Sequence, residues 1–277
     1  MVRRSIAGDA PAEARARPLR SGRYTVQEAR PPEPVPRLRV EVLHHFRVLR
    51  DGRHIVLPTG SEQLIARLVV EDRPFARSAV AAALWPERSD HDAGTLLRRA
   101  LWRLNHDVPG LVECYSRQII LSRSIEVDLA EVNRIVEATH QGTPPVSAHA
   151  VRLLEGDLLP QWSEPWLDAP RESLRQVRLH TLETLARNDL DAGRPGSALV
   201  AALAAAGLEP LRESAHRIVI AAHLAEGNAS EALRHYTHFR DLLWAEMRLR
   251  PSARLESMLT ESGHVVSLSA RRGALNA

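Results

Sequence analysis

The stretch DAGTLLRRALWRLNHD, residues 92–107, has the pattern of an amphipathic helix with a basic outer face. At about 100° per residue, one side collects the apolar residues Ala93, Leu97, Ala100, Leu101 and Leu104. The opposite side carries Thr95, Arg99, Trp102 and His106, with Arg98 and Arg103 beside them. A tryptophan among arginines leaves much apolar area in water unless a partner covers it. The stretch therefore predicts a helix that rests on a core and presents its basic face to a partner.

The segments before this helix predict a small sheet followed by two further helices. Alternating apolar residues favour short antiparallel strands at 38–42, 46–48 and 55–57, with a turn at Asp51-Gly52. Either Thr59 or Ser61 is positioned to cap a helix that runs to about Val70. A second helix fits residues 78–85, and Pro86 stops it.

Strand character returns after the basic helix. Residues 111–112 and 119–121 are apolar and flank a polar tip at 116–118, which is typical of a hairpin. Strands, three helices and a hairpin form the element order of a winged helix-turn-helix.

The second half of the chain predicts an all-α domain. From Glu126 onward the pattern is helical, and Asp128 is expected to cap the first helix. The segments DAGRPGSAL (191–199) and AEGNASEAL (225–233) match with a period of 34 residues. That period is typical of tetratricopeptide repeats, which place Gly in the turn and a small Ala at the closest packing. Trp162 and Trp166 are expected to anchor a loop against helices.

Charge and composition restrict the class of protein. All 37 basic residues are arginine; residues 1–36 and 37–122 each carry a net charge of +3, whereas residues 123–262 carry −5. A basic front and an acidic second half fit a protein whose front faces phosphates. One cysteine, Cys114, excludes an internal disulfide framework, and the absence of a long apolar run or leader predicts a soluble cytoplasmic protein.

Several motifs, taken in order, resemble the Streptomyces antibiotic regulatory protein (SARP) family. In the first half they are LPTGSEQLIARLVV, the Leu84-Trp85-Pro86 stop, LLRRALWRLN and IIL…IEVDLAEV; in the second they include GDLLPQWSEPWLDAPRESLRQVRLHTLETLA and HLAEGNASEALRHYTHFRDLL. The resemblance covers roughly residues 38–262. It implies a mainly α protein in which an OmpR-type winged helix-turn-helix precedes a tetratricopeptide-like bacterial transcriptional activator domain. It also implies an activator that binds direct repeats in promoter DNA and recruits RNA polymerase to biosynthetic gene clusters.

The predicted organisation has four parts, and the chain departs from its relatives at two turns. The parts are a disordered basic arm (1–36), the winged helix (37–122), the tetratricopeptide-like domain (124–262) and a flexible tail (263–277). Many relatives carry Gly in the first strand where this chain has His44-His45, and Gly in the wing where it has Tyr115-Ser116. No P-loop motif is present, so no nucleotide cofactor is expected.

The basic helix supplies most of the candidate DNA contacts: Thr95, Arg98, Arg99, Trp102 and Arg103. Arginine can bind O6 and N7 of guanine together, and a threonine can meet a thymine methyl or a phosphate. Trp102 has two interpretations, one over a sugar or thymine methyl in the groove and the other at the seam between the two domains. The alternative for the whole face is a solvated basic surface.

Two further arginines and one loop complete the candidate interface. Arg117 at the hairpin tip is expected to enter the minor groove, and Arg77 begins a helix whose N-terminus offers N–H groups to a phosphate or simply needs capping. The resemblance implies that the loop at 86–92 meets the sigma subunit of RNA polymerase. Its candidate residues are Glu87, Arg88 and Asp90, and the alternative is an ordinary exposed loop.

No enzyme or metal site is predicted. The paired histidines lack HExxH spacing and a third ligand, and no GxSxG motif or base for Cys114 is present. The resemblance thus implies an activator that contacts polymerase through its sigma subunit and the C-terminal domain of its alpha subunit. Binding to direct repeats implies that it pairs with a second protomer on DNA. The alternatives are a tetratricopeptide-type protein-interaction adaptor and a repressor that uses the same DNA-binding domain.

Overall fold

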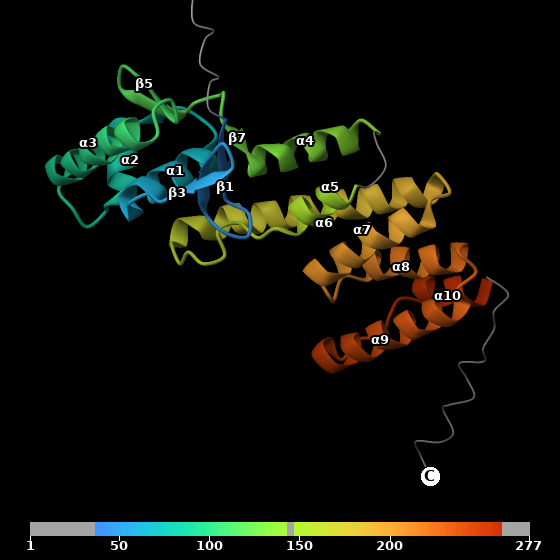
Figure 1. Cartoon of the computed structure of the whole chain (residues 1–277). Helices are drawn as coiled ribbons and strands as arrows, with labels where there is room; N and C mark the ends of the chain where they lie inside the picture. Colours follow the sequence, from blue (N-terminus) through green and yellow to red (C-terminus); the bar gives the residue numbers. More distant parts are fainter. Residues whose placement is uncertain (1–36, 143–146, 262–277) are drawn as a thin grey trace, which may run out of the picture. The chain divides into compact units, whose positions relative to one another are not determined.

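The computed structural model of the protein describes residues 37–142 and 147–261, and it is mainly α-helical, as predicted (Figure 1). The predicted arm (1–36) and tail (263–277) lie outside the described residues. Short strands and three helices come first, followed by a long run of helices. In the part of the chain that is described, no helix is long and apolar enough to cross a membrane.

A four-stranded sheet opens the first half. Strands β1 (Leu38–Glu41), β2 (Arg47–Arg50) and β3 (Arg53–Ile55) pair antiparallel as the alternation predicts, and Val40 opposite Val48 is fully buried. The fourth strand, β7 (Glu126–Val127), pairs parallel with β1. The expectation that everything after residue 126 is helical is therefore wrong by these two residues.

Helices α1 (Thr59–Glu71), α2 (Arg77–Leu84) and α3 (Asp90–Asp107) form the helix-turn-helix. The apolar stripe of α3 lies inside as predicted, except that Leu101 is only half-buried. The cap predicted for α1 is wrong: α1 begins directly after Pro58 without a side-chain cap. Ser61, one of the two candidates, is buried inside the helix.

The predicted hairpin forms the wing. Strands β5 (Val112–Tyr115) and β6 (Gln118–Leu121) pair antiparallel, and β6 also pairs with the short strand β4 (Phe75–Ala76) just before α2. Both positions at which relatives carry glycine adopt left-handed backbone, because φ is +66° at His44 and +52° at Ser116. Glycine suits such turns because it has no Cβ.

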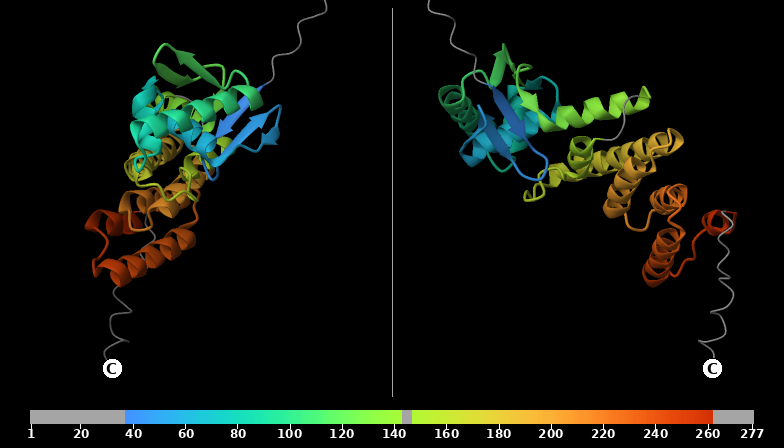
Figure 2. Two further views of the ribbon diagram at one scale, coloured as in Figure 1. Left: turned by 90° about the vertical axis from the view of Figure 1, so that its left-hand side faces the viewer. Right: turned by 45° about the vertical axis from the view of Figure 1, so that its right-hand side comes forward.

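The second half is helical, and most of it is a stack of five helices, α6 to α10, that follow one another along the chain (Figure 2). Before them lie α4 (Asp128–His140), α5 (Ala148–Glu155) and the short 3-10 helix η1 (Pro165–Leu167). The stack itself is α6 (Asp168–Asp191), α7 (Pro195–Leu208), α8 (Glu213–Ala225), α9 (Ala229–Met247) and α10 (Ala253–Glu261).

The predicted repeat is visible in the turns between helices. Gly193 (φ +70°) lies between α6 and α7, and Gly227 (φ +76°) lies between α8 and α9. The repeat-equivalent Ala198 and Ala232 are fully buried. The sequence period therefore corresponds to a structural period of one helix pair.

Asp128 does not cap α4 as predicted, because it is the first residue of that helix and lies buried beneath β1. Its carboxylate accepts hydrogen bonds from the backbone N–H groups of Val42 (3.0 Å), Leu43 (2.9 Å) and Leu129 (2.7 Å). Burial raises the pKa of Asp128, and these hydrogen bonds oppose the shift. Asp128 therefore satisfies mainly the two backbone N–H groups that follow β1, in addition to the N–H of Leu129 in its own helix.

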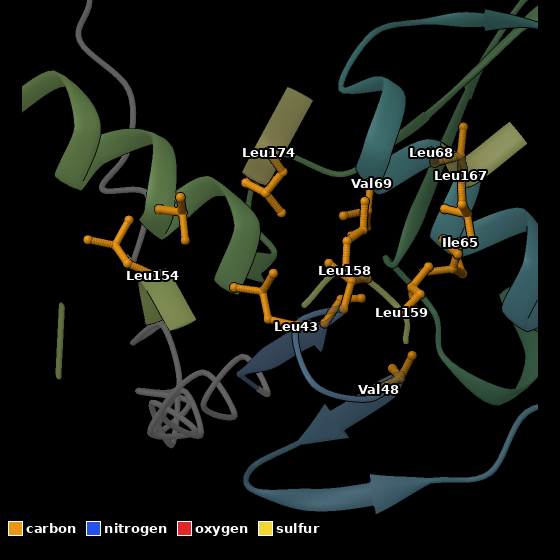
Figure 3. Packing of buried hydrophobic residues seen from close by; sticks show 14 of the residues in the cluster. Leu43, Val48, Ile65, Leu68, Val69, Leu154, Leu158, Leu159, Leu167 and Leu174 are labelled. Carbon is orange, nitrogen blue, oxygen red and sulfur yellow. The ribbon is translucent and has the colours of Figure 1, made fainter. Parts of the chain in front are cut away.

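The segment after α5 packs against the first half. Leu43 forms a β-bridge with Leu158, His44 donates its backbone N–H to the carbonyl of Asp157 (2.8 Å), and Leu159 donates to Val42 (2.8 Å). Leu43, Leu158 and Leu159 lie together among buried leucines and valines in Figure 3. The buried apolar cluster of the first half thus continues into the second without a break.

Two aromatic contacts reinforce this packing. The ring of Trp162 lies 5.6 Å from that of Phe46, and the guanidinium of Arg67 lies 4.5 Å from the ring of Trp166. Arg171 of α6 donates hydrogen bonds to the carbonyls of Leu158, Leu159 and Trp162. Both tryptophans therefore pack as the sequence predicts.

Candidate nucleic-acid interface

The exposed face of α3 carries the residues that the sequence singled out. Arg98, Arg99, Trp102 and Arg103 are exposed, and Thr95 is half-buried. Within the described residues, the side chains of Arg99 and Arg103 form no ion pair or hydrogen bond. A helix that keeps unpaired arginines and a tryptophan in water offers both charge and apolar area to a ligand.

Thr95 and Arg98 interact with each other. The hydroxyl of Thr95 donates to the carbonyl of His91 (3.0 Å) and accepts a hydrogen bond from Nη2 of Arg98 (2.7 Å). This pair holds the Arg98 guanidinium against its own helix, near the N-terminal part of α3. Thr95 thus orients a candidate base-reading arginine.

Trp102 is 67% exposed, the second highest value among large apolar side chains in the described residues. Its ring stacks on that of His106, one turn later, with centroids 5.6 Å apart and planes nearly parallel. A place in the seam between the two halves would bury the indole. Its exposure therefore favours the groove interpretation of Trp102.

The wing and the start of α2 meet. The backbone N–H of Arg77 donates to the carbonyl of Arg117 (2.8 Å), and Ala76 pairs with Gln118. The structure thereby brings together two predicted DNA contacts that lie 40 residues apart in the chain. Arg117 is exposed in the two-residue turn of the wing, and Arg77 is half-buried.

Tyr115 is a candidate that sequence reasoning missed. It is 61% exposed on the wing, and its hydroxyl donates a hydrogen bond to Glu113. Hydrogen bonds from Ser122 and then Tyr115 hold the pKa of Glu113 below its usual value, and the same carboxylate raises the pKa of Tyr115. The position of Tyr115, an aromatic residue next to the predicted hairpin tip, was the available signal.

A groove of about 440 Å³ is lined by residues of both α2 and α3. It is lined by small and apolar side chains, including Ala81, Ala93 and Leu97, and by three charged ones, Arg77, Arg98 and Asp90. The groove places the N-terminus of α2 and the N-terminal part of α3 beside one open channel, which suits the approach of a phosphate backbone.

The predicted polymerase-contact loop is shorter than expected. The residues between α2 and α3 are 85–89, so Glu87 and Arg88 lie in the loop, but Asp90 is already helical. Ser89 caps α3, accepting from the N–H of Asp92 (3.2 Å) and donating to its carboxylate (2.7 Å). Part of the acidity of this segment is therefore explained by the start of a helix.

The histidines do not assemble a metal site within the described residues. His216 and His235 share a hydrogen bond of 2.9 Å between Nδ1 and Nε2, and the His216 ring stacks on Phe239. Burial lowers the pKa of His216, and burial together with the neighbouring His216 lowers that of His235 to about 4. These rings pack between α8 and α9.

Comparisons with known proteins agree with this architecture. Residues 127–261 match the family described as bacterial transcriptional activator domain. The chain is 29% identical over 236 residues to regulatory protein AfsR of Streptomyces coelicolor, an alignment that covers 80% of this chain and 24% of AfsR. It resembles the structure of Mycobacterium tuberculosis EmbR in complex with a low-affinity phosphopeptide, with a TM-score of 0.53 and 22% identity. That match covers 82% of this chain and 65% of the EmbR chain, so this chain spans only part of each relative.

Proposed function

Because this chain belongs to the SARP family of transcriptional regulators, we propose that it is a sequence-specific activator that binds direct repeats in promoter DNA. The observation that carries the proposal is the exposed face of α3, on which Arg98, Arg99 and Trp102 lie together without cover from the second half. The family consists of regulators rather than enzymes, and no cofactor enters the proposal.

In the proposed complex, α3 enters the major groove. Arg98, oriented by Thr95, and Arg99 read guanine edges, and Arg103 contacts the backbone. Trp102 packs on a sugar or a thymine methyl. Each well-formed arginine–guanine pair contributes about 1–3 kcal/mol of discrimination between bases.

The wing and α2 hold the backbone on either side. Arg117 enters the adjacent minor groove, and the N-terminus of α2 at Arg77 binds a phosphate. The backbone hydrogen bond between Arg77 and Arg117 supports the idea that the wing and the start of α2 bind DNA as one rigid clamp. Tyr115 joins this clamp as a sugar or phosphate contact.

Activation proceeds through contacts with RNA polymerase. Glu87 and Arg88 in the α2–α3 loop, with Asp90 at the start of α3, contact the sigma subunit, and the helical half contacts a second protomer and the alpha C-terminal domain. The regulated genes form a secondary-metabolite cluster, and the protein acts at the bacterial nucleoid in the cytoplasm. The resemblance of the motifs and the match at residues 127–261 support these parts of the proposal.

DNA binding is tested by gel shift and footprinting of the upstream genomic region at two salt concentrations. The expected result is a protected pair of in-phase repeats, lost in Arg98→Ala/Arg99→Ala and retained in the control Arg134→Ala/Arg152→Ala, whose arginines lie on α4 and α5. Affinity should fall steeply with salt, because phosphate contacts release counterions. Weak, unpatterned binding with no difference between the variants would favour a protein-interaction adaptor instead.

Activation is tested by transcription in vitro with purified RNA polymerase on the same promoter. The wild type should increase transcript, and Glu87→Ala/Arg88→Ala should bind DNA normally but activate less. Exclusion of polymerase from the promoter by the wild type would identify a repressor and overturn the activator.

A further inference from the structure

Helix α7 is a surface helix without a single charged residue among its 14 positions. Its exposed positions are Gly196, Val200, Leu203 and Gly207, which recur at helical spacing along one face. Val200 and Leu203 are each nearly half exposed. A surface helix normally carries charged or polar residues on its outer face, so this face has the character of an interface.

A second apolar surface lies at the end of α9. If α9 followed the repeat, it would have the same length as its equivalent α7. It is longer, with 19 residues against 14. The extension and the following turn carry Trp244, Met247 and Leu249, which are 48–54% exposed. These three residues are called the α9 tip.

The segment 244–250 around the α9 tip carries two arginines against one exposed carboxylate, Glu246, and is weakly basic, in contrast to the acidic half that contains it. Arg248 lies 5.9 Å from the ring of Trp244, and Arg250 follows two residues later. Both arginines are exposed, and neither forms an ion pair within the described residues. At the α7 face the charge is opposite, because the carboxylate of Glu226 lies beside Gly196.

The α7 face and the α9 tip are on different helices. Helix α8 lies between α7 and α9 and packs against both helices (Figure 1). They hold all the exposed large apolar residues of the described second half. Two protomers on direct repeats are related by translation along the DNA, so their contact joins two different surfaces. The α7 face, with the carboxylate of Glu226 beside it, and the α9 tip, with Arg248 beside it, are two such different surfaces of opposite charge.

We infer that the α9 tip of one protomer docks on the α7 face of a second copy of this chain when both occupy adjacent repeats. This inference rests on the proposed function. The five apolar side chains cover far less than the roughly 1,200–2,000 Å² of a stable interface, so pairing depends on the high effective concentration that DNA provides. The protein is then monomeric or weakly associated in solution.

The first test measures cooperativity, as the ratio of affinities for a fragment with two repeats and for a fragment with one. Wild type should show a ratio of about tenfold. Val200→Gln/Leu203→Gln and Trp244→Gln/Met247→Gln should each lose this ratio while keeping single-site affinity and melting temperature. Val56→Gln, an exposed apolar residue of the first half, is the matched control and should behave as wild type.

Mixing the two double variants distinguishes this contact from others. A head-to-tail pair needs one intact α7 face and one intact tip, so an equimolar mixture should regain cooperativity on part of the DNA. A mixture without recovery, or variants that keep cooperativity alone, would overturn the inference. A tip variant that lowers transcription but not cooperativity would assign the tip to polymerase and also overturn it.

If the proposed function fails, the results differ from those expected when only the docking contact fails. If the wild type does not bind repeats at all, self-association is measured directly by sedimentation velocity at high protein concentration. Weak association that both double variants abolish and their mixture partly restores would sustain the docking contact without DNA. Absence of association there would overturn the inference as well.

Discussion

The hydroxyl of Thr95 lies 2.7 Å from Nη2 of Arg98, so two candidate DNA contacts on α3 form one hydrogen-bonded unit. Because the same hydroxyl donates to the carbonyl of His91, its acceptor side faces the guanidinium. A base-reading arginine that is held before binding loses less side-chain entropy on binding.

Replacing Thr95 with Val should therefore weaken specific DNA binding by about three- to tenfold, because the complex must then supply the roughly 0.5–1.5 kcal/mol that it costs to order the Arg98 side chain. Val keeps the β-branched shape, so helix stability changes little. Thr95→Ser keeps the hydroxyl and should bind nearly as wild type. The measurement is a titration of labelled operator; equal losses in both variants would contradict the positioning role.

Trp102→Ala separates binding from stability. An indole that is 67% exposed adds little to the fold, so the free energy of unfolding should change by less than about 0.5 kcal/mol. Operator affinity should fall by about tenfold or more, because tryptophan is a frequent anchor of interfaces. Denaturant titration measures the free energy of unfolding, and gel shift on the same preparation measures operator affinity. A large loss of stability would favour the alternative interpretation, in which Trp102 lies at the seam between the two halves.

Gly156→Ala should destabilise the contact between the two halves. A Cβ at Gly156 would lie 2.9 Å from Cβ of Leu43 and 2.9 Å from Nε2 of His44. We expect a loss of about 1–3 kcal/mol in the free energy of unfolding, typical of overpacking. Gly207→Ala is the control, because its Cβ meets nothing within 4 Å and alanine favours the helix by roughly 0.5–1 kcal/mol. Equal stability of the two variants in a denaturant titration would contradict this expectation. It would show that Leu43 and His44 can shift to accommodate the added methyl group.

Acid should destabilise the stack through the His216–His235 pair. Both pKa values are lower in the fold than in the unfolded chain, where histidine titrates near about 6.5. The unfolded chain therefore binds more protons below that pH, so stability is unaffected above it and falls as the pH drops toward 4. Since His235 is only partly buried, we expect about 1 kcal/mol at pH 5 after allowance for solvent screening.

His235→Gln tests this dependence. The amide can still donate to Nδ1 of His216, but it does not titrate. The decrease in melting temperature between pH 7.5 and 5 should be smaller in the variant than in wild type. The same decrease in both proteins would exclude His235 as its source.

Elements with strong local patterns were predictable from the sequence. Helix α3 and the repeat turns at Gly193 and Gly227 follow from apolar periodicity and from glycine at a left-handed turn. The two-residue strands β4 and β7 were missed, because each forms only through pairing with a distant strand. The cap predicted at Asp128 was wrong for a similar reason, since Asp128 is already helical and its carboxylate accepts mainly from Val42 and Leu43, which follow β1.

The candidate site divides in the same way. The identity of the arginines and the exposure expected for Trp102 could be read from the pattern of α3. The bond between Thr95 and Arg98 depends on rotamers, and the bond between Arg77 and Arg117 depends on how the wing folds back to α2. No spacing in the chain encodes either.

The pairing of β1 with β7 and the bridge between Leu43 and Leu158 have a consequence for engineering. A chimeric regulator made by exchanging DNA-binding modules at residue 123 would remove an edge strand from the exchanged module and uncover Leu43. Residues 126–128 and 156–162 need to travel with the transplanted module, although they come later in the chain. Retargeting this regulator to a new operator is therefore better attempted by rewriting the face of α3 than by swapping a domain.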